Sequence, residues 1–324
     1  GTVFKYFDFK IMPDFGGGTT VLQDAYLDAR FHPAFKVRFG KGKTPFGLER
    51  LQSATDLMLI ERSLATNLVP NRDIGIYAYG DIVPKRVNYA IGVMNGVIDL
   101  GSADIDNGQD KDFVARIFAY PIPEFGVGIA VTAGDQFGSL LSPSLPSYRT
   151  QGQLVWFRYR AGLTSDLTTL ANGQRMRYSP QGTFYKGPVG ILAEYVSSSQ
   201  EVIRLTDSAD IRNTAYNITT VFALTGEDES YKGIVPENNF DPSSGKWGGI
   251  EVAVRYSRLN IDEDVFPVFA DPLTSASSAE NFGAGLNWYL NKNVKFMFSY
   301  DHTDFETADI KTEQLFMTRF QIAW

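Results

Sequence analysis

The sequence predicts an all-β protein, an antiparallel transmembrane β-barrel. Apolar and polar residues alternate with a period of two in about fourteen segments, which is the pattern of strands with one face buried. The connections between these segments are alternately tight and long. No run of about 18 uncharged apolar residues reads as a membrane-spanning helix. Any membrane span is therefore expected to consist of strands.

Each segment has apolar or aromatic residues at every second position, as in FKVRFG and VKFMFSYDHT. The best helical candidate is short, ATDLMLIERSLA at residues 54–65. In chain order, the alternating segments cover residues 3–12, 21–31, 35–40, 74–80, 87–94, 113–120, 127–134, 175–185, 189–198, 215–225, 249–259, 282–290, 294–303 and 315–324.

The connections give the sheet two unlike ends. Tight joins fall near residues 33, 84, 123, 187 and 292, and the long connections are 41–73, 97–112, 135–174, 199–213, 260–280 and 304–313. Short turns at one end and long loops at the other are typical of outer-membrane barrels. The join at 226–247 breaks the rule, because it falls on the short side yet runs for about twenty residues.

The distribution of aromatic residues indicates whether the apolar face of the strands contacts a protein core or lipid. In a soluble sandwich the apolar face is a packed core, whereas in a membrane barrel it meets lipid and carries aromatics at the strand ends. Here aromatics gather toward strand ends, as in the final TRFQIAW. Phe320, Ile322 and Trp324 are expected to face lipid. We therefore expect a single barrel domain, residues 1–324, that closes on itself because hydrocarbon tolerates no open sheet edge.

Composition excludes several functions. The net charge is -7 and the pI is near 5.0, which argues against a nucleic-acid binder. With no cysteine and two histidines, the chain offers no thiolate site and no histidine cluster, so we expect no metal, no cofactor and no enzymatic activity.

The alternation also assigns charges to the inner face of the barrel. More of them are basic than acidic, although the chain as a whole is acidic, and such a wall favours anions. An alternative is that the cations only pair with the acids of the wall. The basic candidates are Arg30, Lys36, Arg38, Arg116, Arg175, Arg177, Arg255, Lys295 and Arg319; the acids are Asp28, Glu194, Glu251 and Asp301.

The most distinctive stretch is residues 40–75, which is too long for a simple loop and suggests a folded insert. The run LQDAYLDARF, VRFGKGKTPFGLERL, MLIERSL and PNRDIGIYAYGD resembles the phosphate-selective porin O and P family. The later pieces SPQGTFYKGPVGILAEYVSSSQEV, IEVAVRYSRL, GLNWYLNKNVKFMFSYDHTDF and TRFQIAW fit the same family in the same order.

The resemblance implies a sixteen-stranded, trimeric porin in the outer membrane of a Gram-negative bacterium. It implies that GTVFKYFDFKIM is the third strand, so that two strands are expected upstream, and that the terminal aromatic is read by the barrel-assembly machinery. It further implies that residues 43–72 fold into the lumen as a constriction loop. By this resemblance Lys43, Arg50, Arg62 and Arg72 are candidate constriction cations, with Glu49 and Glu61 as counter-charges.

The expected function is passive diffusion of small anions, with phosphate or other oxyanions as candidates. An arginine-rich external segment expected near the middle is replaced by a loop with only Arg149, Arg158 and Arg160, which leaves phosphate specificity open. One alternative is a general or weakly selective porin. Another is a soluble β-rich carbohydrate-active or binding protein, in which Glu194 and Glu251 supply acid and base.

Overall fold

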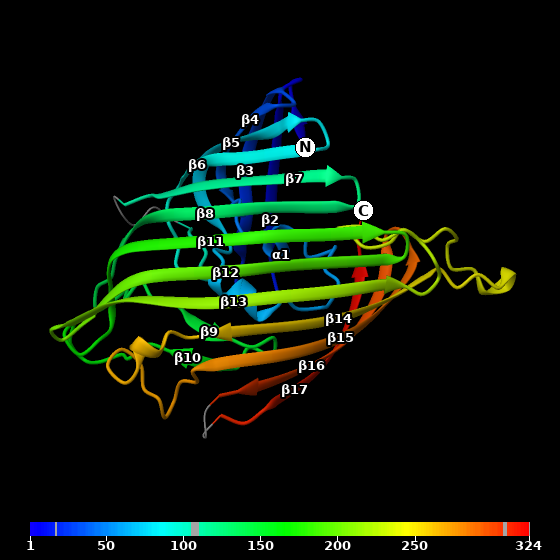
Figure 1. Cartoon of the computed structure of the whole chain (residues 1–324). Coiled ribbons are helices and arrows are strands. Elements are labelled where there is room, and N and C mark those ends of the chain that lie inside the picture. The colour runs from blue at the N-terminus through cyan, green and yellow to red at the C-terminus, as the bar shows by residue number, and fades with distance from the viewer. Residues whose placement is uncertain (17, 105–109, 307–309, 324) are drawn as a thin grey trace.

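A computed structural model describes residues 1–16, 18–104, 110–306 and 310–323; Trp324 lies outside these ranges. One antiparallel sheet of 15 strands dominates it, and neighbouring strands of this sheet follow one another in the chain (Figure 1). Among the described residues, one separate 2-stranded sheet, inserted between β8 and β11, interrupts this order. The all-β prediction is confirmed.

The strands follow the predicted segments closely, and several extend beyond them. The helical elements are single turns: α1 (Leu48–Leu51) and the 3-10 helices η1 (Leu64–Leu68), η2 (Pro242–Ser244) and η3 (Glu263–Val265). Nowhere in the described ranges is a helix long and apolar enough to cross a membrane. The strands are β1 (Thr2–Val3), β2 (Phe7–Asp14), β3 (Val21–His32), β4 (Phe35–Gly42), β5 (Asp73–Val83), β6 (Val87–Met94), β7 (Asp112–Ile122), β8 (Phe125–Phe137), β9 (Ser147–Arg149), β10 (Val155–Arg158), β11 (Leu170–Lys186), β12 (Val189–Arg204), β13 (Asp207–Ala223), β14 (Gly249–Asn260), β15 (Ser278–Asn291), β16 (Val294–Phe305) and β17 (Glu313–Ile322).

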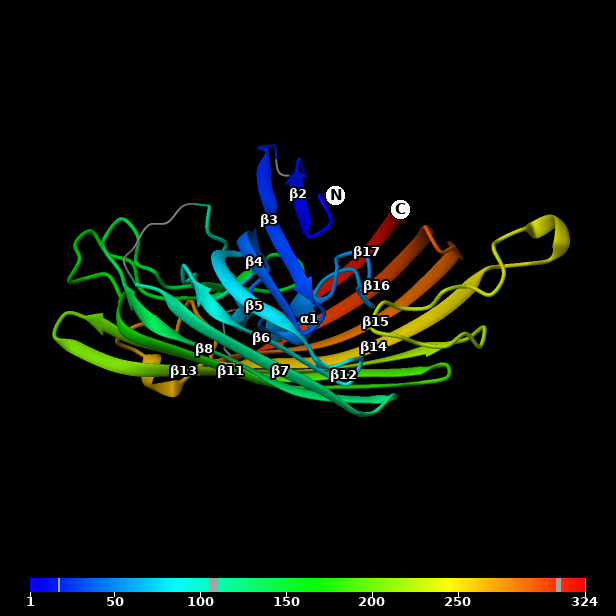
Figure 2. The ribbon, with the colours of Figure 1, turned by 90° about the horizontal axis from the view of Figure 1, so that it is seen from above.

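The sheet is strongly curled. Figure 2 shows a trough, with β2 and β3 rising on one side and β17 on the other. β1 and β17 are the two edges, and no ladder joins them within the described part of the chain. The expected total of sixteen strands stays a prediction.

The outer, convex face of the sheet is apolar. Alternate positions on β15 and β17 expose Phe282, Leu286, Phe320 and Ile322, and the same holds for Phe35 and its neighbours at the other side of the trough. In water such a surface would be very costly, because each exposed apolar side chain loses the free energy of burial. The predicted lipid-facing surface is therefore present as an apolar band around the sheet.

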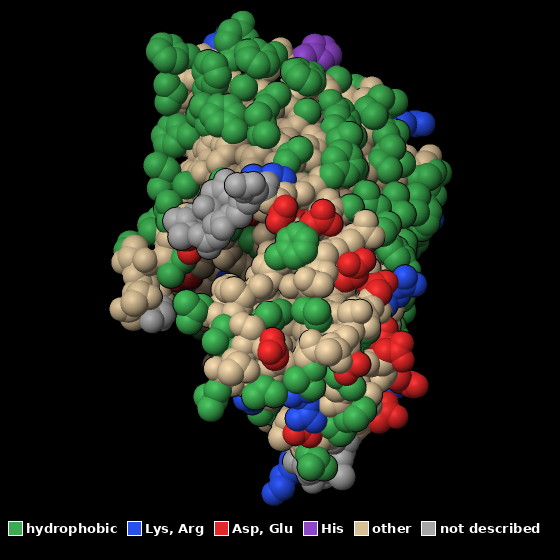
Figure 3. All heavy atoms as spheres, turned by 90° about the vertical axis from the view of Figure 1, so that its left-hand side faces the viewer, with side chains coloured by type: hydrophobic (Ala, Val, Ile, Leu, Met, Phe, Trp, Pro, Cys, Tyr) green, Lys and Arg blue, Asp and Glu red, His purple; other side chains and the backbone are tan. Residues whose placement is uncertain are grey.

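The inside of the trough is filled from the end with the long connections. Phe46, Leu64 and Leu68 from residues 43–72 are fully buried, in one cluster with Trp156 and Phe157 of β10. Figure 3 looks onto this end, where acidic side chains lie among polar ones. The apolar cluster lets the connections pack as a folded body instead of as free loops.

Two expectations are wrong. No helix covers residues 54–63, and the helical candidate 54–65 overlaps η1 only at residues 64–65. The long connection expected at 199–213 is a hairpin, because β12 runs to Arg204 and β13 begins at Asp207, with Leu205 at a φ of 57° in the turn. The outer face of these strand ends is mainly polar, whereas Val202 and Ile211 on the inner face are buried in the apolar cluster, so the lipid-facing alternation is lost and the sequence pattern suggested a loop.

Candidate functional site

Residues 43–72 leave β4, enter the trough and return at β5. Their 3-10 helix η1 lies against β12, β13, β14 and β15. Gly47 makes the turn before α1 with a φ of +78°, where a Cβ would come within 2.6 Å of Val69 Cγ1. Only glycine fits this backbone without displacement. The segment is expected to act as the constriction loop, and we use that name for it below.

A carboxylate of the wall holds the first turn of the constriction loop. Glu194 on β12 accepts hydrogen bonds from the backbone N–H groups of Leu48, at 2.7 Å, and Glu49, at 3.2 Å. These N–H groups are free of helical partners because α1 begins here. Glu194, predicted as a lumen acid, thus serves as an anchor for the loop.

An arginine of the wall holds the middle of the loop. Arg255 on β14 donates to the Glu61 carbonyl oxygen at 2.7 Å and to Asp301 Oδ1 at 2.8 Å, and its Nη1 lies 3.7 Å from Glu49 Oε1. Glu49 also accepts from the Ser63 hydroxyl at 2.6 Å. Four residues predicted as wall or loop charges are therefore engaged with one another.

Three cations of the loop lack such partners. Lys43 Nζ donates to the Gln52 carbonyl oxygen at 2.5 Å, Arg62 Nη2 to the same oxygen at 2.9 Å, and Arg50 Nη2 to the Thr66 carbonyl oxygen at 3.2 Å. Across the described residues, no carboxylate lies within 4.0 Å of these three cations. Arg50 is only 7% exposed, and its Nε has no hydrogen-bond partner.

The loop cations crowd one another. Burial, then the charges of Arg62, Arg72 and Arg50, lower the pKa of Lys43 to about 7. Burial and then Arg62 lower the pKa of Arg50 to about 9. A lowered pKa means that the charged form is destabilised at this place, and an anion bound nearby would reverse that penalty.

Two cavities meet at these side chains. One, of about 220 Å³, lies between the loop and residues 149–153, and the other, of about 670 Å³, lies between the loop and β2 and β3. Arg50, Arg62 and Asn71 line both cavities. The remaining charged residues around them are Lys10, Lys43, Arg72 and Arg149 with Asp14, Asp24 and Glu61.

Arg72 differs from the other loop cations. Its Nε lies 3.0 Å from Asp24 Oδ1, and Lys10 Nζ lies 2.8 Å from the other oxygen of the same carboxylate. One acid thus serves two cations, and the group keeps a positive excess. Arg72 therefore still adds to the field at the meeting point of the cavities.

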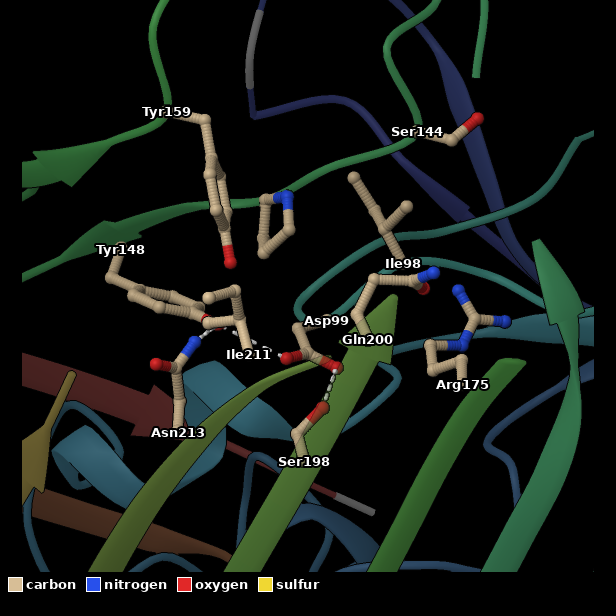
Figure 4. A pocket seen from close by; sticks show the side chains of 11 residues that line it. Ile98, Asp99, Ser144, Tyr148, Tyr159, Arg175, Ser198, Gln200, Ile211 and Asn213 are labelled. Atoms are coloured by element: carbon tan, nitrogen blue, oxygen red, sulfur yellow. Dashed lines mark hydrogen bonds between the residues drawn. The ribbon is translucent and has the colours of Figure 1, made fainter. Parts of the chain in front are cut away.

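Two of the predicted wall cations are buried in ion pairs on β11. Arg177, with a fully buried side chain, pairs with Asp99 at 2.6 Å, and Arg175 pairs with Asp112 at 2.9 Å. In Figure 4 the Asp99 carboxylate points toward Ser198, which donates to it at 3.1 Å. Together with Arg255, these arginines hold the wall and its connections and are shielded from solvent.

The other predicted wall residues lie on the concave face with varied partners. Arg38 pairs with Asp28 and Arg30 with Asp8, each within 2.7 Å. Arg319 is part-buried without an acid within ion-pair distance in the described ranges. The rest have polar or aromatic neighbours: Lys36 over Tyr79, Arg116 with Gln181 and Asn88, Lys295 over Tyr289, and Glu251 with Asn287 and Tyr289.

Sequence reasoning missed several residues of the site. Asn71, Arg149 and Lys10 line the cavities but lie on unrelated segments, and Asp99 on the 95–111 connection was not considered as a partner of a wall arginine. Period-two alternation assigns faces only within strands. The length of the connections was the one available signal that they fold inward.

Known proteins match this chain over most of its length. The family model described as phosphate-selective porin O and P matches residues 1–119 and 158–324. Porin O of Pseudomonas aeruginosa is 26% identical over 335 residues, covering 93% of this chain and 73% of that protein.

Solved structures agree on the fold. The outer-membrane channel DcaP of Acinetobacter baumannii superposes with a TM-score of 0.60 at 11% identity, over 98% of this chain and 80% of that one. An anion-selective porin from Comamonas acidovorans gives a TM-score of 0.53 at 11% identity, over 95% and 76% of the two chains. At these identities the likeness establishes the fold alone.

Proposed function

The chain belongs to the phosphate-selective porin O and P family, outer-membrane porins of Gram-negative bacteria, and on this premise we propose that it passes small anions by diffusion. Phosphate and other oxyanions are candidate permeating ions, because several of them carry more than one negative charge. We further propose that residues 43–72 are its constriction loop and that it acts as a channel without enzymatic activity.

One observation carries the anion proposal. Arg50, Arg62 and Asn71 separate two cavities, and neither arginine has a carboxylate partner in the described part of the chain. Fixed cations in a confined space raise the local anion concentration and repel cations. Carbonyl and amide oxygens orient the guanidinium groups without neutralising them, and Glu49, the acid that acts on both arginines, lies beyond ion-pair distance.

Assembly follows the family in this proposal. A homotrimer in outer-membrane lipid is typical of porins, and insertion by the barrel-assembly machinery suits a final strand that ends in aromatic residues such as Phe320. Cross-linking in detergent and in native membranes would measure the subunit number, with a trimer as the expected result.

Reversal potentials test the proposed selectivity. The purified porin in a planar bilayer, under a potassium chloride gradient, is expected to give the sign of an anion-preferring pore. Added phosphate is expected to reduce the chloride current, because a multivalent anion occupies the loop cations longer. A reversal potential of the cation-preferring sign would refute the proposal.

The second candidate is a weakly selective porin for small solutes. It is favoured by the ion pairs of Arg175, Arg177 and Arg255, which neutralise three of the nine predicted basic residues of the wall. Equal anion and cation permeability without phosphate block would support it. The soluble carbohydrate-active alternative is wrong, because the chain belongs to an outer-membrane family, and Glu194 and Glu251 are both buried.

A further inference from the structure

The join between β13 and β14 enters the trough from the end opposite to the long connections. Its first half is buried at alternate positions, including Glu227, Glu229, Ile234 and Pro236. Its second half projects from the molecule, as the yellow segment of Figures 1 and 2 shows. A turn that only closed a hairpin would need two or three residues, so the buried half calls for another explanation.

The buried half of the join touches the constriction loop. The Tyr231 hydroxyl donates to the Leu48 carbonyl oxygen at 2.5 Å, and Gln52 Nε2 donates to the Tyr231 carbonyl oxygen at 2.8 Å. Leu48 is the first residue of α1, and Gln52 directly follows its last. Since α1 carries Arg50, the join supports from one side the helix that Glu194 holds from the other.

A carboxyl group of the join is buried beside the wall. Glu229 is only 6% exposed, and neither of its oxygens has a hydrogen-bond partner. Among charged groups, Glu251 of β14 acts most strongly on Glu229. The Glu251 carboxylate accepts hydrogen bonds from Asn287 at 2.5 Å and from Tyr289 at 3.3 Å. Two carboxylates buried together cannot both stay ionised at low cost, whereas one shared proton would give both a hydrogen bond.

The surrounding groups do not neutralise Glu229. Burial, then Glu251, raise the pKa of Glu229 to about 9, and Glu227 of the same join adds a further negative charge. The phenols of Tyr185 on β11 and Tyr289 face the pair, and the Tyr185 hydroxyl is buried without a partner. Lys295 of β16 acts on Glu251, and no cation is among the groups that act most strongly on Glu229.

We propose that residues 227–236 form a second constriction element, seated by a proton shared between Glu229 and Glu251, which positions the arginine-bearing turn of the loop through Tyr231. By seating we mean that the element occupies its buried position in the trough. Loss of the proton places two charges in one buried site and releases the element from this position. This proposal needs a pore of the observed fold and holds whichever ion the pore prefers.

The direction of the pH effect follows from linkage. A free glutamate has a pKa near 4.5, whereas Glu229 in the seated element has a pKa of about 9. Between these values the seated form binds more protons than the released form, so a rise in pH weakens seating throughout this range. Seating is complete in acid, is lost progressively toward pH 9, and changes no further above it.

Thiol labelling tests seating directly, because the chain has no cysteine of its own. Ile234 is 4% exposed and packs with Ala223 and Tyr289, whereas its neighbour Val235 is 68% exposed. We would label Ile234→Cys with a maleimide from pH 6 to pH 9.5 and divide its rate by that of Val235→Cys, which corrects for thiolate formation. The ratio is expected to rise by about tenfold or more, and a constant ratio would overturn the proposal.

Conductance of the intact porin gives the second readout. Wild type is expected to conduct at least about twofold better at pH 9.5 than at pH 6, as the element leaves the pore. Glu229→Gln keeps a neutral, hydrogen-bonding side chain and is expected to conduct at the low level throughout. Glu237→Gln, an exposed acid of the same join, is the matched control and should follow wild type.

Two results contradict the mechanism. One is a pH response of Glu229→Gln equal to that of wild type; the other is no response in wild type at all. Tyr231→Phe removes only the hydroxyl and is expected to raise conductance at pH 6 without changing the labelling ratio. Failure of the anion proposal would appear in the sign of the reversal potential, which none of these measurements uses.

Discussion

Two groups of arginines on the inside of the molecule have opposite electrostatic settings. The wall arginines, Arg175, Arg177 and Arg255, are buried and paired with aspartates. The loop arginines, Arg50 and Arg62, bond to carbonyl and amide oxygens and border two cavities. From this comparison we propose that a basic side chain facing the lumen belongs to the scaffold when an acid pairs with it and to the pore when only neutral oxygens do.

The difference has a physical cause. A buried ion pair is worth little over an apolar pair, but removal of one partner leaves an uncompensated charge in a low-dielectric site. A cation without an acid partner keeps its field, which acts on ions in the adjoining water. Wall substitutions should therefore lower stability, and loop substitutions should change selectivity.

The largest expected effect comes from Arg177→Met in the wall. The substitution leaves Asp99 buried without a cation, while Asp112 keeps its pair with Arg175. We expect the free energy of unfolding to fall by about 3–5 kcal/mol. Urea titration in detergent, followed by the gel shift of the folded barrel, measures the loss. Arg158→Met, at an exposed position of β10, is the control and should stay close to wild type.

Next in size is Arg62→Gln in the loop, which removes one charge beside both cavities. At several ångströms in partly screened solvent, one charge is worth roughly 0.6–1.4 kcal/mol. We expect the anion-to-cation permeability ratio to fall by about three- to tenfold. Reversal potentials measure it. A loss of stability like that of Arg177→Met, with unchanged selectivity, would abolish the distinction between the two groups.

A smaller effect is expected from pH. Because the pKa of Lys43 is lowered to about 7, this side chain is charged at pH 6 and mostly neutral at pH 8. The anion-to-cation ratio of wild type should fall by about two- to threefold over this range. Lys43→Arg should remove this pH-dependent fall in the permeability ratio, since arginine stays protonated. If the permeability ratio of that variant still fell between pH 6 and pH 8, the fall would be due to another titrating group.

The smallest effect is expected at Arg258, on the outer side of β14. Its ion pairs with Glu280 and Glu306, both 3.3 Å long, involve exposed side chains. Exposed pairs contribute about 0–1 kcal/mol, so Arg258→Gln should change the free energy of unfolding by no more than that. Urea titration at low and high salt checks it. A loss comparable with that of Arg177→Met would show that burial is not what separates these pairs.

The sequence predicted the strands well because the period-two pattern reflects a physical boundary. Phe282 and Leu286 face outward and Asn281 and Asn287 inward on one strand, and a shift by one residue would exchange lipid and lumen faces. The prediction was wrong at residues 199–213, where the strands pass beyond the apolar band. There the outer face becomes polar, while Val202 and Ile211 on the inner face pack into the apolar cluster, so outward apolar positions no longer mark a strand.

The candidate site could be predicted only in part. The family resemblance indicated residues 43–72, and alternation found Glu194 and Arg255 on the inner face. It could not tell that Glu194 would cap a turn of the loop or that Arg255 would bind the Glu61 carbonyl oxygen. Arg149 and Asn71 were not assigned to the site, because their positions depend on how connections fold inside the trough.

The sequence by itself determined the all-β architecture, the outer apolar face and the excess of cations on the inner face, because each is a property of residues a fixed step apart on one strand. Only the tertiary structure decided which cations stay uncompensated and that the 226–247 join reaches the constriction loop. Both depend on contacts between segments far apart in the chain, such as Tyr231 with Leu48 and Arg177 with Asp99. Local periodicity carries no information about such contacts.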